Sequence, residues 1–152
     1  MSHEKRASLL FSAQSFCNAF ASQAPLNDIL KHFSSTRAND IVVHEHGLRE
    51  LAPFLGRDFN GTKGVESYFE VVASCLSYDN MSFKEYIVDA VENKVSVRGT
   101  AKFTWTSTKQ SWDEVFTYVL GFDEEGKVLQ YEVWADTGAA YLASKGQLGS
   151  MD

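Results

Sequence analysis

A glutamate interrupts a row of aromatic side chains in the second half of this 152-residue sequence. Side chains along a β-strand point alternately to opposite faces, so Glu114 shares its face with large apolar residues. These apolar residues are Trp112, Phe116, Tyr118, Leu120 and Phe122. An acid among rings is costly unless the row lines a cavity or the acid has a partner. The pattern therefore indicates an apolar cavity with a carboxyl group on its wall.

A second acidic candidate, Glu45, lies in the first β-type run of the chain. Ile41, Val43 and Glu45 share one face of this strand, whereas His44 and His46 lie on the other. A carboxyl at the bottom of an apolar pocket has a raised pKa and exchanges protons near neutral pH. The alternative is a solvated carboxylate on an edge strand between two histidines.

The two histidines also invite a metal interpretation. The run from His44 to Glu50 matches the His-x-His-x-x-x-Glu element of cupins, in which such residues hold a metal. A site of that kind needs a further histidine from a later strand, and none follows His46 in the sequence. We therefore expect no metal, with one histidine beside the pocket and one outside it.

Hydrophobic periodicity predicts the elements that must position these residues. Predicted helices are Lys5–Ser22, a short one from Pro25, Thr62–Ser77 with Thr62 as N-cap, and a last turn at Ala139–Ala143. Predicted strands are Ile41–His46, Met81–Val91, Lys94–Ser107, Trp112–Phe122 and Lys127–Ala135, with Leu51–Gly61 irregular. Gly99 suggests a bend or bulge. This order predicts an α+β domain in which a curved antiparallel sheet and three helices on one face form a cone with a pocket inside.

Length and composition narrow the class of protein. We expect one domain over residues 1–152, with a core at about 7–143 and a frayed tail at 144–152. The net charge of −6 and scattered basic residues argue against nucleic-acid binding. No apolar run approaches the roughly 18 residues of a membrane span, and no signal-peptide core is present. Cys17 and Cys75 indicate reduced thiols in a cytoplasmic protein.

The order of elements resembles the nuclear-transport-factor-2-like (NTF2-like) superfamily, specifically its SnoaL-like polyketide cyclase, ketosteroid isomerase and scytalone dehydratase group. The resemblance spans about residues 7–143. It rests on Ile41–Gly47, Gly61–Phe69, Phe122–Val128 and the run ending at Trp134–Asp136. The resemblance implies a cystatin-like α+β barrel. It leaves the reaction open, because that superfamily hosts isomerases, cyclases, dehydratases, epoxide hydrolases and binding modules.

The resemblance implies roles for two residues. Glu45 occupies the place of the general-base aspartate of ketosteroid isomerases. Tyr118 falls where those enzymes carry an oxyanion-stabilising acid, and its hydroxyl can donate to a developing enolate. The alternative for Tyr118 is a core tyrosine with a satisfied hydroxyl. Glu114 is either a second acid–base group or a carboxylate at the cavity mouth.

Three further candidates lie near the expected pocket. SnoaL-like cyclases carry a catalytic acid on the last strand, so Glu132 and Asp136 are candidates, although the histidine of that pair is missing here. Our register places Tyr131 inward and Glu132 outward, and a shift of one residue would reverse this. Arg37 either contacts a substrate carbonyl or Glu45, or forms a surface ion pair.

The sequence thus predicts a cofactor-independent isomerase, cyclase or dehydratase acting on a hydrophobic, carbonyl-bearing small molecule such as a polyketide or terpenoid intermediate. The candidate acid–base residues are Glu45, Tyr118, Glu114, Arg37, Glu132, Asp136, His44 and His46. The candidate substrate-contacting residues are Phe103, Trp105, Phe116, Tyr131, Phe54 and Tyr68. The alternative is a non-catalytic binding or dimerisation module of the same fold. In either case we expect a homodimer through the outer sheet face.

Overall fold

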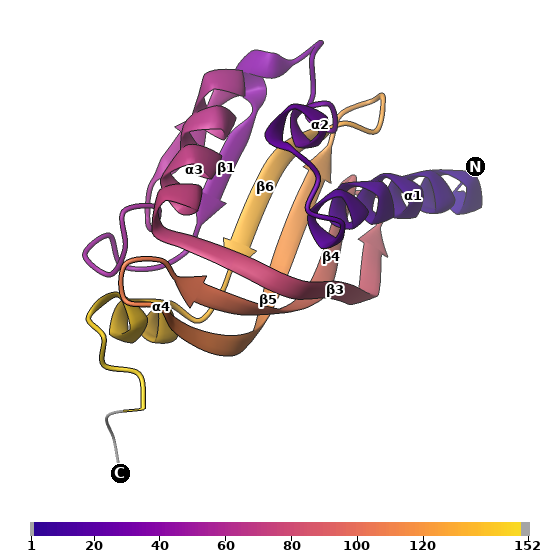
Figure 1. The fold of residues 1–152 in the computed structure, drawn as a ribbon. Coiled ribbons are helices and arrows are strands. Elements are labelled where there is room, and N and C mark those ends of the chain that lie inside the picture. The colour runs from indigo at the N-terminus through magenta and orange to yellow at the C-terminus, as the bar shows by residue number, and fades with distance from the viewer. Residues whose placement is uncertain (1, 150–152) are drawn as a thin grey trace.

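The computed structural model describes residues 2–149 of the chain (Figure 1). Residue 1 of the predicted domain and residues 150–152 of the predicted tail therefore lie outside the described residues. The helices are α1 (Ser2–Ala21), α2 (Leu26–Leu30), the 3₁₀ helix η1 (Ala38–Asp40), α3 (Gly61–Cys75) and α4 (Thr137–Ser144). The strands are β1 (Val42–Glu45), β2 (Asp58–Asn60), β3 (Leu76–Asp89), β4 (Lys94–Trp105), β5 (Gln110–Phe122) and β6 (Val128–Trp134).

The six strands form a single sheet in the order β2-β1-β6-β5-β4-β3. The predicted antiparallel meander β3–β6 is confirmed, but β1 pairs with β6 in parallel, so the sheet is mixed. The parallel pair is possible because α3 and four strands, β2 to β5, separate β1 from β6 along the chain. Strands β2 and β3 are the two edges of the sheet and do not pair with each other. The α+β cone is therefore as predicted, but it is an open, curled sheet and not a closed barrel.

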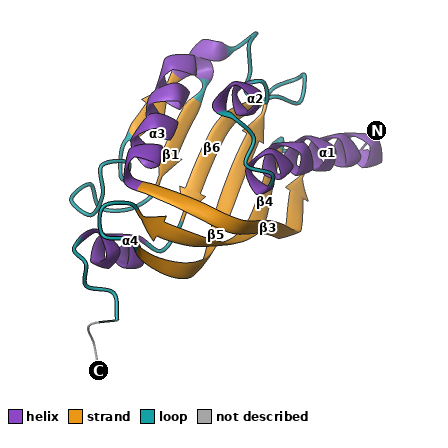
Figure 2. Ribbon diagram, viewed as in Figure 1, coloured by secondary structure: helices purple, strands orange, loops and turns teal. Residues whose placement is uncertain are grey.

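Helices α1, α2 and α3 cover one face of the sheet, and α4 lies at its lower end (Figure 2). Helix α1 buries a stripe at helical spacing, namely Leu9, Ala13, Phe16, Cys17 and Phe20. Helix α3 buries Val65 and Tyr68 on the side that faces β1. The inner face of the sheet and these helical stripes together enclose the core.

Some boundaries differ from those predicted. Helix α3 ends at Cys75 and β3 begins at Leu76, because residues 76–79 pair with β4. The backbone ladder therefore overrides the helical pattern that extended to Ser77. The N-cap of α3 is Asn60, without a side-chain hydrogen bond, so the prediction of Thr62 as N-cap is wrong. The stretch predicted as irregular contains β2, which pairs with β1.

The curl of the sheet is concentrated in β3. Its pairing with β4 shifts register at two places, and Asn80 and Glu85 near these shifts adopt positive φ angles of 55° and 62°. By contrast, Gly99 lies in an unbroken β4–β5 ladder and is not a bulge. A Cβ atom at Gly99 would lie 2.3 Å from the Phe116 ring, so this glycine makes room for an aromatic side chain.

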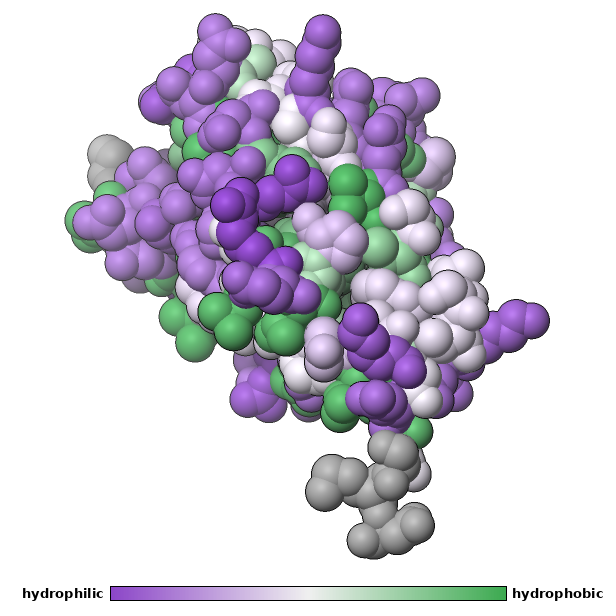
Figure 3. Space-filling model, turned by 90° about the vertical axis from the view of Figure 1, so that its left-hand side faces the viewer, coloured by the Kyte–Doolittle hydropathy of each residue, from purple (hydrophilic) through white to green (hydrophobic). Residues whose placement is uncertain are grey.

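The surface on the α3 side of the molecule is largely hydrophilic, with hydrophobic side chains visible between the polar ones (Figure 3). None of the helices within residues 2–149 is long and apolar enough to span a membrane.

Candidate active site

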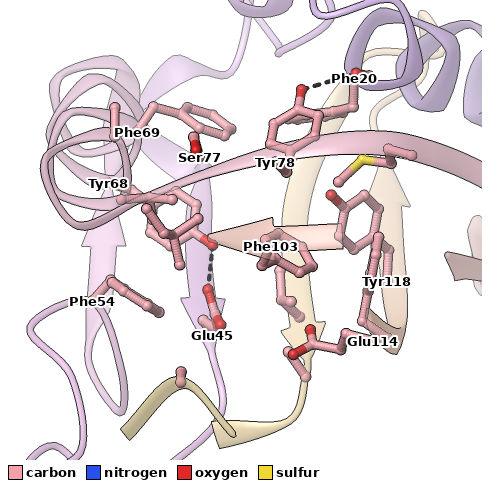
Figure 4. Close-up of a pocket in the computed structure, with 18 of the residues that line it drawn as sticks. Phe20, Glu45, Phe54, Tyr68, Phe69, Ser77, Tyr78, Phe103, Glu114 and Tyr118 are labelled. Carbon is pink, nitrogen blue, oxygen red and sulfur yellow. Dashed lines mark hydrogen bonds between the residues drawn. The ribbon is translucent and has the colours of Figure 1, made fainter. Parts of the chain in front are cut away.

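A cavity of about 520 Å³ lies between the inner face of the sheet and helices α1, α3 and α4. Its walls are mostly aromatic and aliphatic (Figure 4). The aromatic lining residues include Phe20, Phe54, Phe69, Phe103, Phe116 and Tyr118. Among the described residues that line it, none is Lys, Arg or His, whereas Glu45, Glu70, Glu114 and Asp136 are acids. A cavity of this size and composition is typical of a small-molecule site.

The Glu45 carboxyl enters this cavity from the end of β1. Glu45 is only 8% exposed. The Tyr68 hydroxyl of α3 donates a hydrogen bond to Glu45 Oε1 at 2.6 Å (Figure 4). Burial raises the pKa of Glu45 to about 7, the Tyr68 hydrogen bond lowers it, and repulsion from Glu114 raises it. A carboxyl with that pKa can both accept and release a proton at neutral pH.

A second carboxyl, Glu114 of β5, enters the same cavity. It is also 8% exposed, and the indole Nε1–H of Trp112 donates to Glu114 Oε1 at 2.7 Å. Burial raises the pKa of Glu114 to about 7, and the charge of Asp136 also raises it, whereas hydrogen bonds from the Trp112 indole and the Asp136 backbone lower it. Both carboxyls therefore change charge in the same pH range.

Tyr118 lies opposite Glu45 in one row across the sheet. Val133 of β6 pairs with Glu45 on one side and with Tyr118 on the other, so two strand spacings, about 10 Å, separate their backbones. Both side chains belong to the inner face, and both line the cavity. The carboxyl of Glu45 and the phenol of Tyr118 therefore border the same cavity.

The Tyr118 hydroxyl is in contact with the hydroxyl of Tyr131. Burial raises the pKa of Tyr118 well above its ordinary value, while the Tyr131 hydrogen bond lowers it. The same contact raises the pKa of Tyr131, after the larger effects of burial and of the Tyr118 and Tyr68 charges.

Four of the six residues predicted to contact substrate line the cavity, namely Phe54, Tyr68, Phe103 and Phe116. Trp105 and Tyr131 are buried but do not line the cavity. Tyr131 packs among other rings, including Phe16 at 5.3 Å and Tyr118 at 4.9 Å between ring centroids.

The predicted register of the last hairpin is confirmed by the pairing of β5 with β6. Tyr131 and Val133 are buried on the inner face, whereas Glu132 lies on the outer face. Glu132 is therefore outside the cavity. Asp136 does line the cavity, and its Oδ1 also caps α4 by accepting from Ala139 N–H at 3.0 Å.

His44 of β1 and His46, which directly follows β1, both lie on the outer face, so the expectation of one histidine beside the pocket is wrong. His44 Nδ1 lies 2.7 Å from Asp58 Oδ1, and His46 Nε2 lies 2.8 Å from Glu132 Oε2. The His46 ring also stacks on Trp134 at 4.1 Å. The physical reason is parity, because residues two apart on a strand share a face and Glu45 occupies the inner one.

Arg37 also lies away from the cavity. Its side chain is 43% exposed and pairs with Asp40 at 3.1 Å and with Glu124 at 2.9 Å. The surface ion pair is thus the correct alternative, because Arg37 immediately precedes η1 and faces the β5–β6 turn. Within residues 2–149, no three or more His, Cys, Asp or Glu side chains gather as a metal site would require.

Sequence reasoning missed the two donors that hold the carboxyls. The prediction gave Tyr68 a substrate contact and Trp112 no role, yet each hydrogen-bonds a cavity carboxyl. Trp112 and Glu114 are two residues apart on one strand face, so that pair had a sequence signal. Tyr68 and Glu45 come from different elements 23 residues apart, and no sequence pattern links them.

Comparison of the sequence with protein-family models and with curated proteins finds no match. Solved structures do match. An NTF2-like protein of unknown function from Burkholderia pseudomallei K96243 superposes with a TM-score of 0.72 at 17% identity, covering 87% of this chain and 93% of that one. A protein from Jannaschia sp. CCS1 proposed to be a SnoaL-like polyketide cyclase gives a TM-score of 0.72 at 10% identity, covering 91% and 92%.

A third similar structure is the BvnE pinacolase from Penicillium brevicompactum. It has a TM-score of 0.71 at 17% identity, and the match covers 94% of this chain and 92% of that one. At such identities the likeness establishes the fold and not the reaction. This chain therefore has the NTF2-like fold.

Proposed function

We propose that this protein is a cofactor-independent isomerase, cyclase or dehydratase that transfers a proton within a hydrophobic, carbonyl-bearing small molecule. The observation that carries the proposal is the Glu45 carboxyl, buried in an apolar cavity and bound by the Tyr68 hydroxyl at 2.6 Å. With its pKa raised to about 7 by burial, this group is matched to proton transfer at neutral pH.

In the proposed mechanism the Glu45 carboxylate removes a proton from the carbon next to the substrate carbonyl. The electron pair of that C–H bond forms a C=C bond while the π pair of the carbonyl moves to its oxygen, and the Tyr118 hydroxyl donates a hydrogen bond to the resulting enolate oxygen. Return of the proton from Glu45 to a different carbon gives an isomer, whereas transfer of that proton from Glu45 to a departing β-hydroxyl releases water and gives a dehydration product. The row Glu45–Val133–Tyr118 supports these roles because it holds base and donor on opposite sides of one space.

Two of the similar structures support this class of reaction, since one is a pinacolase and another is proposed to be a polyketide cyclase. A polyketide- or terpenoid-like substrate fits the aromatic walls and the volume of about 520 Å³. The shared fold supports the proposed reaction class only together with the buried carboxyl in the cavity.

The test is hydrogen–deuterium exchange, which needs no knowledge of the natural substrate. A panel of hydrophobic ketones, with 2-tetralone as the first member, is incubated with the protein in D₂O at neutral pH, and loss of α-proton signal is followed by NMR. We expect exchange above the buffer rate with the wild type, and its loss in Glu45→Gln. Glu92→Gln, which alters an exposed turn, is the matched control and retains exchange. Exchange that continues unchanged in Glu45→Gln would remove Glu45 from the mechanism.

A non-catalytic binding or dimerisation module is the second candidate, and a pure scaffold of this kind would have a cone filled by its own rings. The cavity and its two titrating carboxyls favour the enzyme instead. Homodimerisation through the outer sheet face stays a proposal. Exposed Trp134 and Val115, at 42% and 62% exposure, support it, and sedimentation of the wild type beside Trp134→Lys tests it.

A further inference from the structure

The mechanism above uses Glu45 and leaves the second carboxyl of the cavity without a role. Glu114 lies in a corner that also contains Asp136, Trp112 and Phe103, all of which line the cavity. Trp112 and Phe103 stack with ring centroids 5.8 Å apart and planes inclined by 28°. We call this group of four residues the acidic aromatic corner.

Above about pH 7, where Glu114 is mostly ionised, the acidic aromatic corner holds negative charge from Glu114 and the exposed Asp136 that no basic side chain among the described residues neutralises. The charge of Asp136 raises the pKa of Glu114, after the larger effect of burial, so the two groups repel each other. Neither carboxyl forms an ion pair with any residue in the range 2–149. The donors that do reach these two carboxyls are uncharged N–H groups, from the Trp112 indole and from the backbone of Asp136 and Ala139.

An organic ammonium group is the ligand chemistry that complements this corner. It supplies the missing positive charge to the carboxyls and donates charge-assisted hydrogen bonds to their oxygens. Aromatic faces also attract cations, Trp most strongly, and the effect grows when water is excluded. An anionic ligand would meet only like charge, since no basic side chain lines the cavity in the described part of the chain.

We propose that the substrate of this cavity carries a basic nitrogen, bound as an ammonium ion by Glu114 and Asp136 against the Trp112 and Phe103 rings. The hydrocarbon part of the molecule then lies along the aromatic walls toward Glu45. This assigns different tasks to the two buried carboxyls, with Glu114 as the counter-ion and Glu45 as the proton carrier. The inference deepens the proposed function and rests on it only in taking this cavity as the substrate site.

Three ligands of nearly the same shape and different charge test the inference. They are 2-naphthylmethylamine, 2-naphthylmethanol and 2-naphthoate, each titrated calorimetrically into the wild type at pH 8. We expect the amine to bind about ten-fold or more tightly than the alcohol, and the carboxylate to bind more weakly than the alcohol. An amine that binds no more tightly than the alcohol overturns the proposal, and this result requires no variant to fold.

Two variants then locate the preference. Glu114→Gln should lose most of the amine's advantage while the affinity for the alcohol changes less than about two-fold. Asp136→Asn keeps an oxygen for the α4 cap and should lose a smaller part of it. Glu92→Gln is the control and should keep the full preference. A preference that survives both cavity substitutions would contradict the assignment to the acidic aromatic corner.

The exchange assay separates this inference from the proposed function. In Glu45→Gln the amine preference should persist while ketone exchange is lost. Amine preference without any exchange in the wild type would refute the proposed function and leave the ammonium site standing. Exchange without amine preference would refute the ammonium site alone.

Discussion

Replacement of Glu45 by glutamine should change how the stability of the protein depends on pH. In the unfolded chain this carboxyl has its ordinary pKa of 4.5, and burial raises the pKa in the folded protein to about 7. Between these values the folded protein keeps a proton that the unfolded chain has lost. The free energy of unfolding therefore falls as the pH rises through this window, and the contribution of Glu45 is fully retained only below pH 4.5.

The size of the effect follows from the two pKa values. One pKa unit corresponds to about 1.4 kcal/mol, so a rise from 4.5 to about 7 amounts to about 3 kcal/mol, most of it lost between about pH 5 and pH 8. A domain of this kind is stable by only about 5–15 kcal/mol, so this change is readily measured. The glutamine side chain of the variant has no such titration, yet its amide oxygen can still accept a hydrogen bond from Tyr68.

The assay is urea denaturation of the wild type and Glu45→Gln at intervals from pH 5 to pH 8, followed by circular dichroism. We expect the stability of the variant to fall less with pH than that of the wild type, by about 2–3 kcal/mol over this range. Glu114 titrates in both proteins with a contribution of the same sign, so the difference reports Glu45 together with its repulsion from Glu114. Glu92→Gln should follow the wild-type curve. Parallel curves for wild type and Glu45→Gln would refute the burial of an ionisable Glu45 in an apolar cavity.

Three other substitutions test separate parts of the structure. Tyr68→Phe removes the hydroxyl that lowers the pKa of Glu45, so this pKa should rise above about 7, measured by ¹³C NMR of labelled glutamate; an unchanged titration would contradict the 2.6 Å hydrogen bond. Gly99→Ala places a methyl group against the Phe116 ring and should cost about 1–3 kcal/mol in urea denaturation, whereas a neutral result would show that the ring moves freely. Asp136→Ala should cost about 1 kcal/mol through loss of the α4 cap, and Asp136→Asn should recover most of it; equal losses would argue against capping.

Periodicity along the chain was sufficient to predict the fold class, the meander and the faces of its strands. Strict alternation of side chains requires that Glu45, Tyr118 and Glu114 lie on inward faces, since the alternative would expose whole rows of apolar residues. The same parity correctly directed Glu132 outward. Local periodicity is a property of the chain, so these features need no knowledge of distant contacts.

Which inward residues meet, and in what surroundings, depends on contacts that exist only in the folded protein. The parallel pairing of β1 with β6 sets Glu45 across from Tyr118, and the packing of α3 brings Tyr68 to Glu45. These contacts join segments far apart in the sequence, and no local pattern encodes their distances. The raised pKa values of the carboxyls depend on how completely those contacts exclude water, which is a property of the folded cavity and not of any stretch of sequence.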